Sequence, residues 1–110
     1  MSKSYTMLKT RSELKDHVKK HQVVIVKFKA EWCGPCKKIE PLVNTLMKSY
    51  PKINYVVVDV DDGSNIASYL KIRSIPTMVS YLDGDIHEIL SSSKQEDIES
   101  FFKKTNSHVK

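Results

Sequence analysis

The stretch Trp32-Cys33-Gly34-Pro35-Cys36 decides how this chain of 110 residues is interpreted, because it lies between two differently patterned segments. Before it, Val23 to Phe28 is a β-branched run typical of a strand buried on both faces. After it, apolar residues recur at helical spacing until Pro51. These residues are Ile39, Leu42, Val43, Leu46 and Met47. The two cysteines therefore lie where a buried strand ends and an amphipathic helix begins.

This position favours thiol–disulfide chemistry. Two intervening residues let the sulfurs of Cys33 and Cys36 meet across one helical turn and close a disulfide. At a helix N-terminus, unpaired amides and the helix dipole favour an anion, which lowers the pKa of the Cys33 thiol from its usual value of about 8.5. Gly34 lets a partner's backbone approach, and Pro35 is tolerated at the start of a helix. We expect Cys33 to attack a partner's disulfide and Cys36 to release the reduced partner, with no bound cofactor.

The rest of the chain predicts an α/β fold in which a mixed central β-sheet carries helices on both faces, in the order βαβαβαββα. Two capping boxes, Thr10–Glu13 and Ser93–Glu96, are expected to open the first and last helices. Pro41 is expected to kink the helix after the cysteines. The other predicted elements are strands at Tyr5–Leu8 and Ile53–Val60, a short helix marked by Ile66, Tyr69 and Leu70, and a hairpin of Thr77–Leu82 and Asp85–Leu90 around Asp83-Gly84.

Length and composition narrow the class of protein. We expect residues 1–110 to form a single domain, and 40% hydrophobic and 28% charged residues are ordinary for a globular chain. The net charge of +5 comes from lysines spread along the chain, which argues against nucleic-acid binding. No apolar run is long enough for a membrane span or a signal peptide. We therefore expect no membrane partner and a reducing compartment, the cytoplasm, where a close cysteine pair is catalytic or metal-binding.

A zinc site is the main chemical alternative for the cysteine pair. It would need two further ligands. His17 and His21, four residues apart, could supply them only if the predicted fold is wrong. We therefore predict no metal.

Two segments resemble a known family. Ala30-Glu31-Trp32-Cys33-Gly34-Pro35-Cys36-Lys37 is similar to the active-site motif of the thioredoxin family, and Arg73-Ser74-Ile75-Pro76-Thr77 resembles its second signature. The resemblance extends over nearly the whole chain, to about Lys104. It implies the thioredoxin fold and a protein-disulfide oxidoreductase that carries electrons in cell redox homeostasis. It also implies disulfide-containing proteins as partners and a thioredoxin reductase as electron donor. We expect a monomer.

The resemblance also implies a surface for substrates. It implies a cis bond between Ile75 and Pro76, opposite the cysteines, although only about 5–6% of X-Pro bonds in folded proteins are cis. Trp32, Ile75 and Pro76 would form a flat apolar surface around Cys33, and the Ile75 backbone would pair with an extended stretch of the partner. Each of two residues also has an alternative role that involves no substrate. Trp32 could be a packing residue, and Pro76 could simply be the first residue of a strand.

Two positions depart from the family pattern. Lys27 stands where many thioredoxins have a buried aspartate, and the lysine that often pairs with this aspartate is matched here by Val57. The Lys27 ammonium could reach water along its stem, could act as a neutral base, or could remain charged near the sulfurs. Our hypothesis is the last: together with Lys29, Lys37 and Lys38, it would stabilise thiolates and raise the reduction potential.

The second departure is Ser92, which replaces a common glycine and is expected to narrow the substrate groove. The sequence thus predicts a thiol–disulfide oxidoreductase. One alternative is a thioredoxin-fold binding module or complex subunit with incidental redox activity. Another is an oxidase or isomerase of an oxidising compartment. The intact Cys33-Gly34-Pro35-Cys36 segment argues against the module, because a pure scaffold gains nothing from a thiol prone to oxidation.

Overall fold

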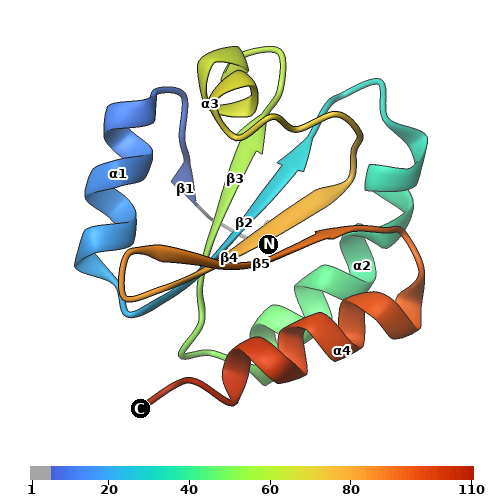
Figure 1. The fold of residues 1–110 in the computed structure, drawn as a ribbon. Coiled ribbons are helices and arrows are strands. Elements are labelled where there is room, and N and C mark those ends of the chain that lie inside the picture. The colour runs from blue at the N-terminus through green and yellow to red at the C-terminus, as the bar shows by residue number, and fades with distance from the viewer. Residues whose placement is uncertain (1–5) are drawn as a thin grey trace.

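The computed structural model describes residues 6–110, which form a five-stranded β-sheet with helices packed on both faces (Figure 1). The elements are β1 (Thr6–Met7), α1 (Arg11–Lys20), β2 (Val23–Lys29), α2 (Gly34–Ser49), β3 (Asn54–Asp59), α3 (Ser64–Tyr69), β4 (Thr77–Leu82), β5 (Asp85–Ser91) and α4 (Gln95–Asn106). The predicted order βαβαβαββα is confirmed. Of the predicted first strand, Tyr5 lies outside the described residues.

The sheet is mixed, and β2 lies at its centre. The strands are arranged in the order β1-β3-β2-β4-β5. β1, β3 and β2 are parallel, whereas β4 is antiparallel to both β2 and β5. The first six residues of β2 are all buried, which confirms that this strand is covered on both faces. Its carboxyl end leads directly into the cysteine segment.

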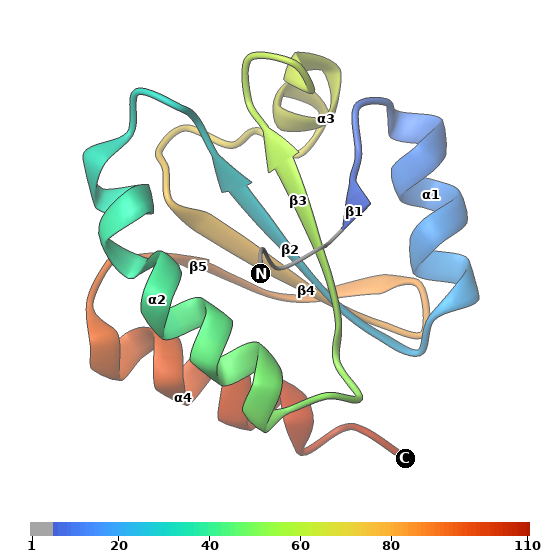
Figure 2. The same ribbon diagram turned by 180° about the vertical axis from the view of Figure 1, so that it is seen from behind.

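Two apolar layers hold the helices on the sheet. α1 and α3 cover one face, and α2 and α4 cover the other (Figures 1 and 2). The side chains of β2 alternate between these layers, as expected for a strand. Val24 and Phe28 pack on the side of α1 and α3, whereas Val23 and Ile25 pack on the side of α2 and α4.

The predicted capping box of α1 is confirmed. The Glu13 backbone N–H donates to Thr10 Oγ1 at 3.1 Å, and the Thr10 N–H donates to Glu13 Oε1 at 2.9 Å. Leu14 and Val18 face the core from the next two turns. His21 is half-buried and follows the helix as its C-cap, so it does not extend the inner face.

The capping box predicted for the last helix is wrong. α4 begins one residue later than that pattern requires, with Lys94 as its N-cap and no side-chain cap hydrogen bond. The neighbouring Ser92 takes over part of this role, because its Oγ accepts the Lys94 N–H at 3.0 Å and donates to Asp97 Oδ2 at 2.7 Å. The residues after β5 therefore turn into α4 through Ser92 rather than Ser93.

The predicted hairpin is confirmed. Asp83 and Gly84 join β4 to β5 with φ of 52° and 89°, the positive values that a two-residue type I′ turn requires. α2 continues through Pro41 to Ser49, and the kink expected at Pro41 stays a prediction. None of the helices within residues 6–110 combines the length and apolar character needed to cross a membrane.

Candidate active site

Cys33 and Cys36 lie where the chain leaves β2 and enters α2. Cys33 is the N-cap residue of α2, and its Sγ accepts a hydrogen bond from the Cys36 backbone N–H at 3.1 Å. A disulfide joins the two residues, whose Cα atoms are 5.3 Å apart. The predicted placement of the pair at a helix N-terminus is therefore confirmed. In the reduced protein this amide would point at the sulfur that carries negative charge.

The disulfide is sheltered, whereas the loop around it is open. Cys33 is 3% exposed and Cys36 is 1% exposed. Gly34 and Pro35 between them are exposed, and a Cβ built on Gly34 would meet nothing within 4 Å. A partner's chain can therefore approach the turn closely from this side. The apolar residues packed around the cysteines are Ala30, Val60 and Ile75.

Trp32 is held over the neighbouring loop by an acidic residue that the sequence analysis did not single out. Its side chain is 69% exposed, and its indole N–H donates to Asp61 Oδ2 at 3.0 Å. The Asp61 backbone N–H in turn donates to Asp59 Oδ1 at 2.9 Å. Asp61 follows β3 as Trp32 follows β2, and these strands are parallel neighbours. The sequence could have indicated the contact between Trp32 and Asp61 through this arrangement, because the carboxyl ends of adjacent parallel strands share one edge of the sheet.

The second signature lies beside the cysteines. The Ile75–Pro76 peptide bond is cis, as expected. Ile75 is half-buried against the cysteine cluster, whereas Pro76 is buried, so Trp32 and Ile75 provide the apolar surface that remains accessible. Thr77 pairs with Ser91 in the antiparallel β4–β5 ladder, and continuing that register places Ser92 opposite Pro76.

Lys27 is buried under α2. The residue as a whole is only 2% exposed, but among the described residues no fully buried side-chain nitrogen lacks a partner, so the ammonium at the end of the stem keeps a small contact with water. In the sheet it lies between Val57 on β3 and Met78 on β4, two apolar residues of the layer beneath α2 and α4. Val57 therefore does occupy the position adjacent to Lys27. Among the described residues, no hydrogen bond or ion pair of the Lys27 ammonium is present.

Glu40 is the acidic group that acts on Lys27, and sequence reasoning missed it. Burial lowers the pKa of Lys27, the Glu40 carboxylate opposes that shift, and the Lys29 cation adds to it. Glu40 is half-buried and follows Cys36 by four residues on α2, which places both on one side of the helix. In the sequence, only this spacing of four residues from Cys36 indicated that Glu40 lies near the site.

The other lysines near the loop are more exposed. Lys29 forms an ion pair with Glu31 at 3.0 Å, and this hydrogen bond raises the pKa of Lys29. Lys37 and Lys38 are exposed on the first turns of α2. Within residues 6–110, no three His, Cys, Asp or Glu side chains are grouped so that they could hold a metal ion.

Comparisons with known proteins agree with this geometry. The family model described as Thioredoxin matches residues 5–104. The chain belongs to the thioredoxin family. Among its relatives, thioredoxin from Ophiophagus hannah is 35% identical over 76 residues, which cover 68% of this chain and 72% of the relative. The family assignment and the cysteine pair make this chain a thiol–disulfide oxidoreductase, and neither favours a binding module.

Solved structures show the thioredoxin fold as well. Oxidised mitochondrial thioredoxin 3 from Saccharomyces cerevisiae superimposes with a TM-score of 0.87 at 29% identity, covering 91% of this chain and 94% of that one. A second similar chain superimposes with a TM-score of 0.88 at 29% identity. It comes from a structural study of how the glutathione and thioredoxin systems resolve the thiol of the yeast mitochondrial 1-Cys peroxiredoxin. The match covers 92% of this chain and 95% of that chain.

Proposed function

We propose that this protein acts as a single domain that reduces disulfides in partner proteins, with Cys33 as the nucleophile and Cys36 as the resolving thiol. The observation that carries this assignment is the position of Cys33 at the N-cap of α2, where the Cys36 N–H donates to its sulfur. This amide and the helix dipole stabilise a thiolate on Cys33. Cys36 is 1% exposed, against 3% for Cys33, and lies inside the first turn, which suits the second, intramolecular step.

The reaction transfers two electrons without a bound cofactor. The Cys33 thiolate attacks one sulfur of the partner's disulfide, which forms a mixed disulfide and releases one partner thiolate. The Cys36 thiolate then attacks the Cys33 sulfur and breaks the mixed disulfide. The second partner thiolate leaves and takes up a proton, and the Cys33–Cys36 disulfide is restored. Two electrons from a reductase return the protein to its dithiol form.

The partner binds over the exposed loop. Trp32 and Ile75 offer apolar contact beside the disulfide, while the backbone at Ile75 next to Pro76 pairs with an extended stretch of the partner. Ser92 borders the same groove opposite Pro76, and its hydroxyl is held by Asp97 and Lys94. The serine therefore forms a fixed wall where a glycine would leave more room.

Lys27 raises the reduction potential in this proposal. A cation buried beneath α2 stabilises thiolates and hence the reduced protein, and Glu40 weakens that effect by partly balancing the charge. Replacing Lys27 with methionine should lower the potential by on the order of 30 mV, measured in glutathione buffers. Replacing the exposed Lys20 with methionine is the control and should leave it unchanged. An unaltered potential in Lys27→Met would refute this role.

The proposal also includes the partners and the compartment. Disulfide-containing proteins are the substrates, a thioredoxin reductase supplies the electrons, and the protein works as a monomer in the cytoplasm. The neighbouring structure from the peroxiredoxin study suggests that oxidised peroxiredoxins belong to the substrate class. Because one matched structure is mitochondrial, fractionation of cells is the test of the compartment.

Trapping of the mixed disulfide tests the mechanism. The wild-type protein should reduce the disulfides of insulin with electrons from NADPH and a thioredoxin reductase, and Cys33→Ser should abolish turnover. Cys36→Ser should instead accumulate a mixed disulfide through Cys33, visible as a combined mass under non-reducing conditions. An exposed serine on α3, Ser68→Ala, is the control. Turnover by Cys33→Ser, or no trapped adduct with Cys36→Ser, would contradict the assigned roles.

A further inference from the structure

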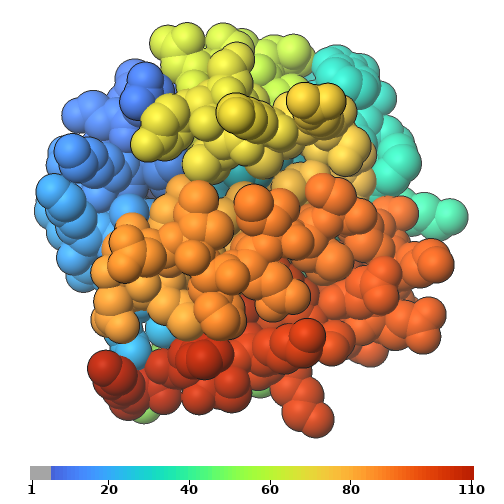
Figure 3. Space-filling model, in the orientation of Figure 1, coloured from blue at the N-terminus to red at the C-terminus, as the bar shows by residue number. Residues whose placement is uncertain are grey.

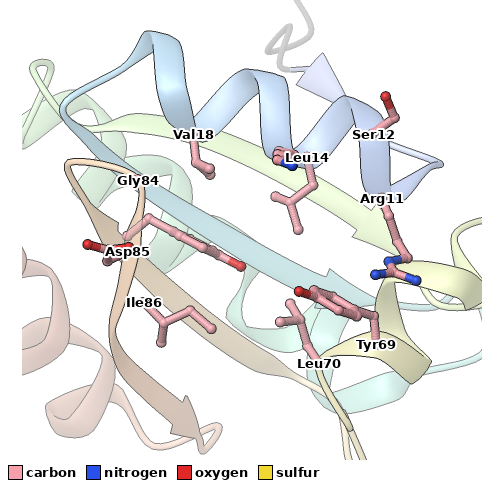
Figure 4. A pocket seen from close by; sticks show the side chains of 11 residues that line it. Arg11, Ser12, Leu14, Val18, Tyr69, Leu70, Gly84, Asp85 and Ile86 are labelled. Atoms are coloured by element: carbon pink, nitrogen blue, oxygen red, sulfur yellow. The ribbon is translucent and has the colours of Figure 1, made fainter.

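A cavity of about 640 Å³ lies away from the cysteines, between α1, α3 and the β4–β5 hairpin. The space-filling view shows the surface hollowed between α3 and the hairpin (Figure 3), and the close-up shows the side chains that line this hollow (Figure 4). None of the residues assigned to disulfide exchange lines it. Its volume lies within the range of small-molecule sites, roughly 300–1,000 Å³.

The interior of the cavity is apolar. Leu14 and Val18 project into it from α1, Leu70 from the end of α3 and Ile86 from β5 (Figure 4). Ile86 is 47% exposed although it sits on a sheet face, so the hollow leaves apolar surface in contact with water. A ligand with an apolar body would cover that surface, which is the main source of affinity in such sites.

One polar group inside the cavity lacks a partner. Tyr81 is 6% exposed and lines the hollow, no hydrogen bond of its hydroxyl is present among residues 6–110, and the hydroxyl oxygen is in contact with water, because no fully buried side-chain oxygen there lacks a partner. Burial, with a contribution from the neighbouring Tyr69, raises the pKa of Tyr81 to about 12. The phenol therefore stays protonated at neutral pH and can donate a hydrogen bond to a ligand.

The charge at the cavity is positive at one end. The Arg11 guanidinium lies 3.9 Å above the centre of the Tyr69 ring, which holds it at the rim. Arg11 and Lys15 form no ion pair within the described part of the chain. Asp85 is the one carboxylate among the lining residues described, and it lies at the end opposite Arg11 (Figure 4).

We propose that this cavity binds a small amphipathic carboxylate, with its aromatic or aliphatic body against Leu14, Val18, Leu70 and Ile86. The carboxylate lies toward Arg11 and Lys15 and accepts a hydrogen bond from the Tyr81 hydroxyl. Arginine suits this role because its planar fork of N–H donors matches a carboxylate. The negative charge of Asp85 repels an anion from the far end and thereby favours one orientation of the ligand.

A titration with a matched pair of probes tests the proposal on the intact protein. 3-Phenylpropionate and its neutral amide, 3-phenylpropanamide, differ in charge and little else. Added to ¹⁵N-labelled protein, the acid should shift backbone amide signals of α1, α3 and β5 in a saturable manner, with a dissociation constant on the order of 1 mM. The amide should bind about tenfold more weakly or worse, because it loses the charge-assisted hydrogen bonds.

Three variants assign the binding to the cavity. Arg11→Gln and Tyr81→Phe should each weaken binding of the acid severalfold or more, while the spectrum reports whether each variant is folded. Lys20→Gln makes a similar change of charge on α1 outside the cavity and should bind like the wild type. No saturable shift up to about 10 mM acid would overturn the proposal. So would equal affinity for the neutral amide, shifts centred on Trp32, or unchanged binding by Arg11→Gln.

Discussion

Replacing Lys27 with methionine should stabilise the oxidised protein at neutral pH. Lys27 is 2% exposed, its strand neighbours Val57 and Met78 are apolar, and burial lowers its pKa. Its ammonium therefore gives up hydration that Glu40 only partly replaces. Methionine has a similar length and fits the apolar layer. Glu40 is half-buried, so it keeps contact with water after the change.

The expected gain is about 1–3 kcal/mol in the free energy of unfolding, because replacing buried charge by an apolar side chain of similar volume is neutral or stabilising by up to about 4 kcal/mol. For a domain of this size, each kcal/mol raises the midpoint of thermal unfolding by about 4–6 °C. Guanidinium denaturation of the disulfide-intact protein measures this difference directly. Lys20→Met, which changes an exposed lysine, should stay within about 0.5 kcal/mol of the wild type.

The pH dependence of the gain identifies its cause. Because the pKa of Lys27 is lowered in the fold, the unfolded chain binds more protons between the folded pKa and about 10.4. Wild-type stability therefore rises with pH through that interval relative to Lys27→Met, which lacks the group. The gain should be largest at neutral pH and shrink as the pH approaches about 10. A less stable variant at pH 7, or a gain that does not change with pH, would refute the reasoning.

The local geometry supports other changes in stability, each measured by denaturation of the oxidised protein. Thr10→Ala removes the hydroxyl that caps α1 and should cost about 1 kcal/mol, whereas Thr10→Ser should retain most of it. Gly84→Ala places a side chain at φ of 89° and should cost about 1–2 kcal/mol; no loss would mean that the turn can change type. Gly63→Ala brings a Cβ to 2.8 Å from Val58 Cγ1 and should cost about 1–3 kcal/mol, while Gly34→Ala, with open space around it, should remain near the wild type.

The capping boxes show where sequence reasoning succeeds and where it fails. Thr10–Glu13 forms as predicted because every contact that it needs lies within four residues. Ser93–Glu96 has a similar local pattern, yet α4 starts at Gln95 without a side-chain cap. The start of α4 depends on how β5 ends against β4 and on the Ser92 hydroxyl, which bonds Lys94 and Asp97. A pattern of four residues contains no information about that pairing.

In the candidate site as well, some features follow from local sequence and others depend on the tertiary structure. The position of Cys33 and Cys36 at the start of α2 follows from the change of hydrophobic period around Gly34-Pro35, and is local. The contact between Trp32 and Asp61 crosses from one strand end to the next, so it needs the register of β2 and β3. The influence of Glu40 on Lys27 likewise needs α2 to lie over the centre of the sheet.

By itself, the sequence determined the order of helices and strands, the hairpin turn and a dithiol at a helix N-terminus. Those features depend on periodicity, backbone preferences and contacts over a few residues. Only the tertiary structure decided which distant groups share an environment. It placed Glu40 near the buried Lys27, Asp61 beside the Trp32 indole and the Ser92 hydroxyl on Asp97. It also assembled a cavity from α1, α3 and a hairpin, because strand register and helix packing bring together residues that the chain keeps far apart.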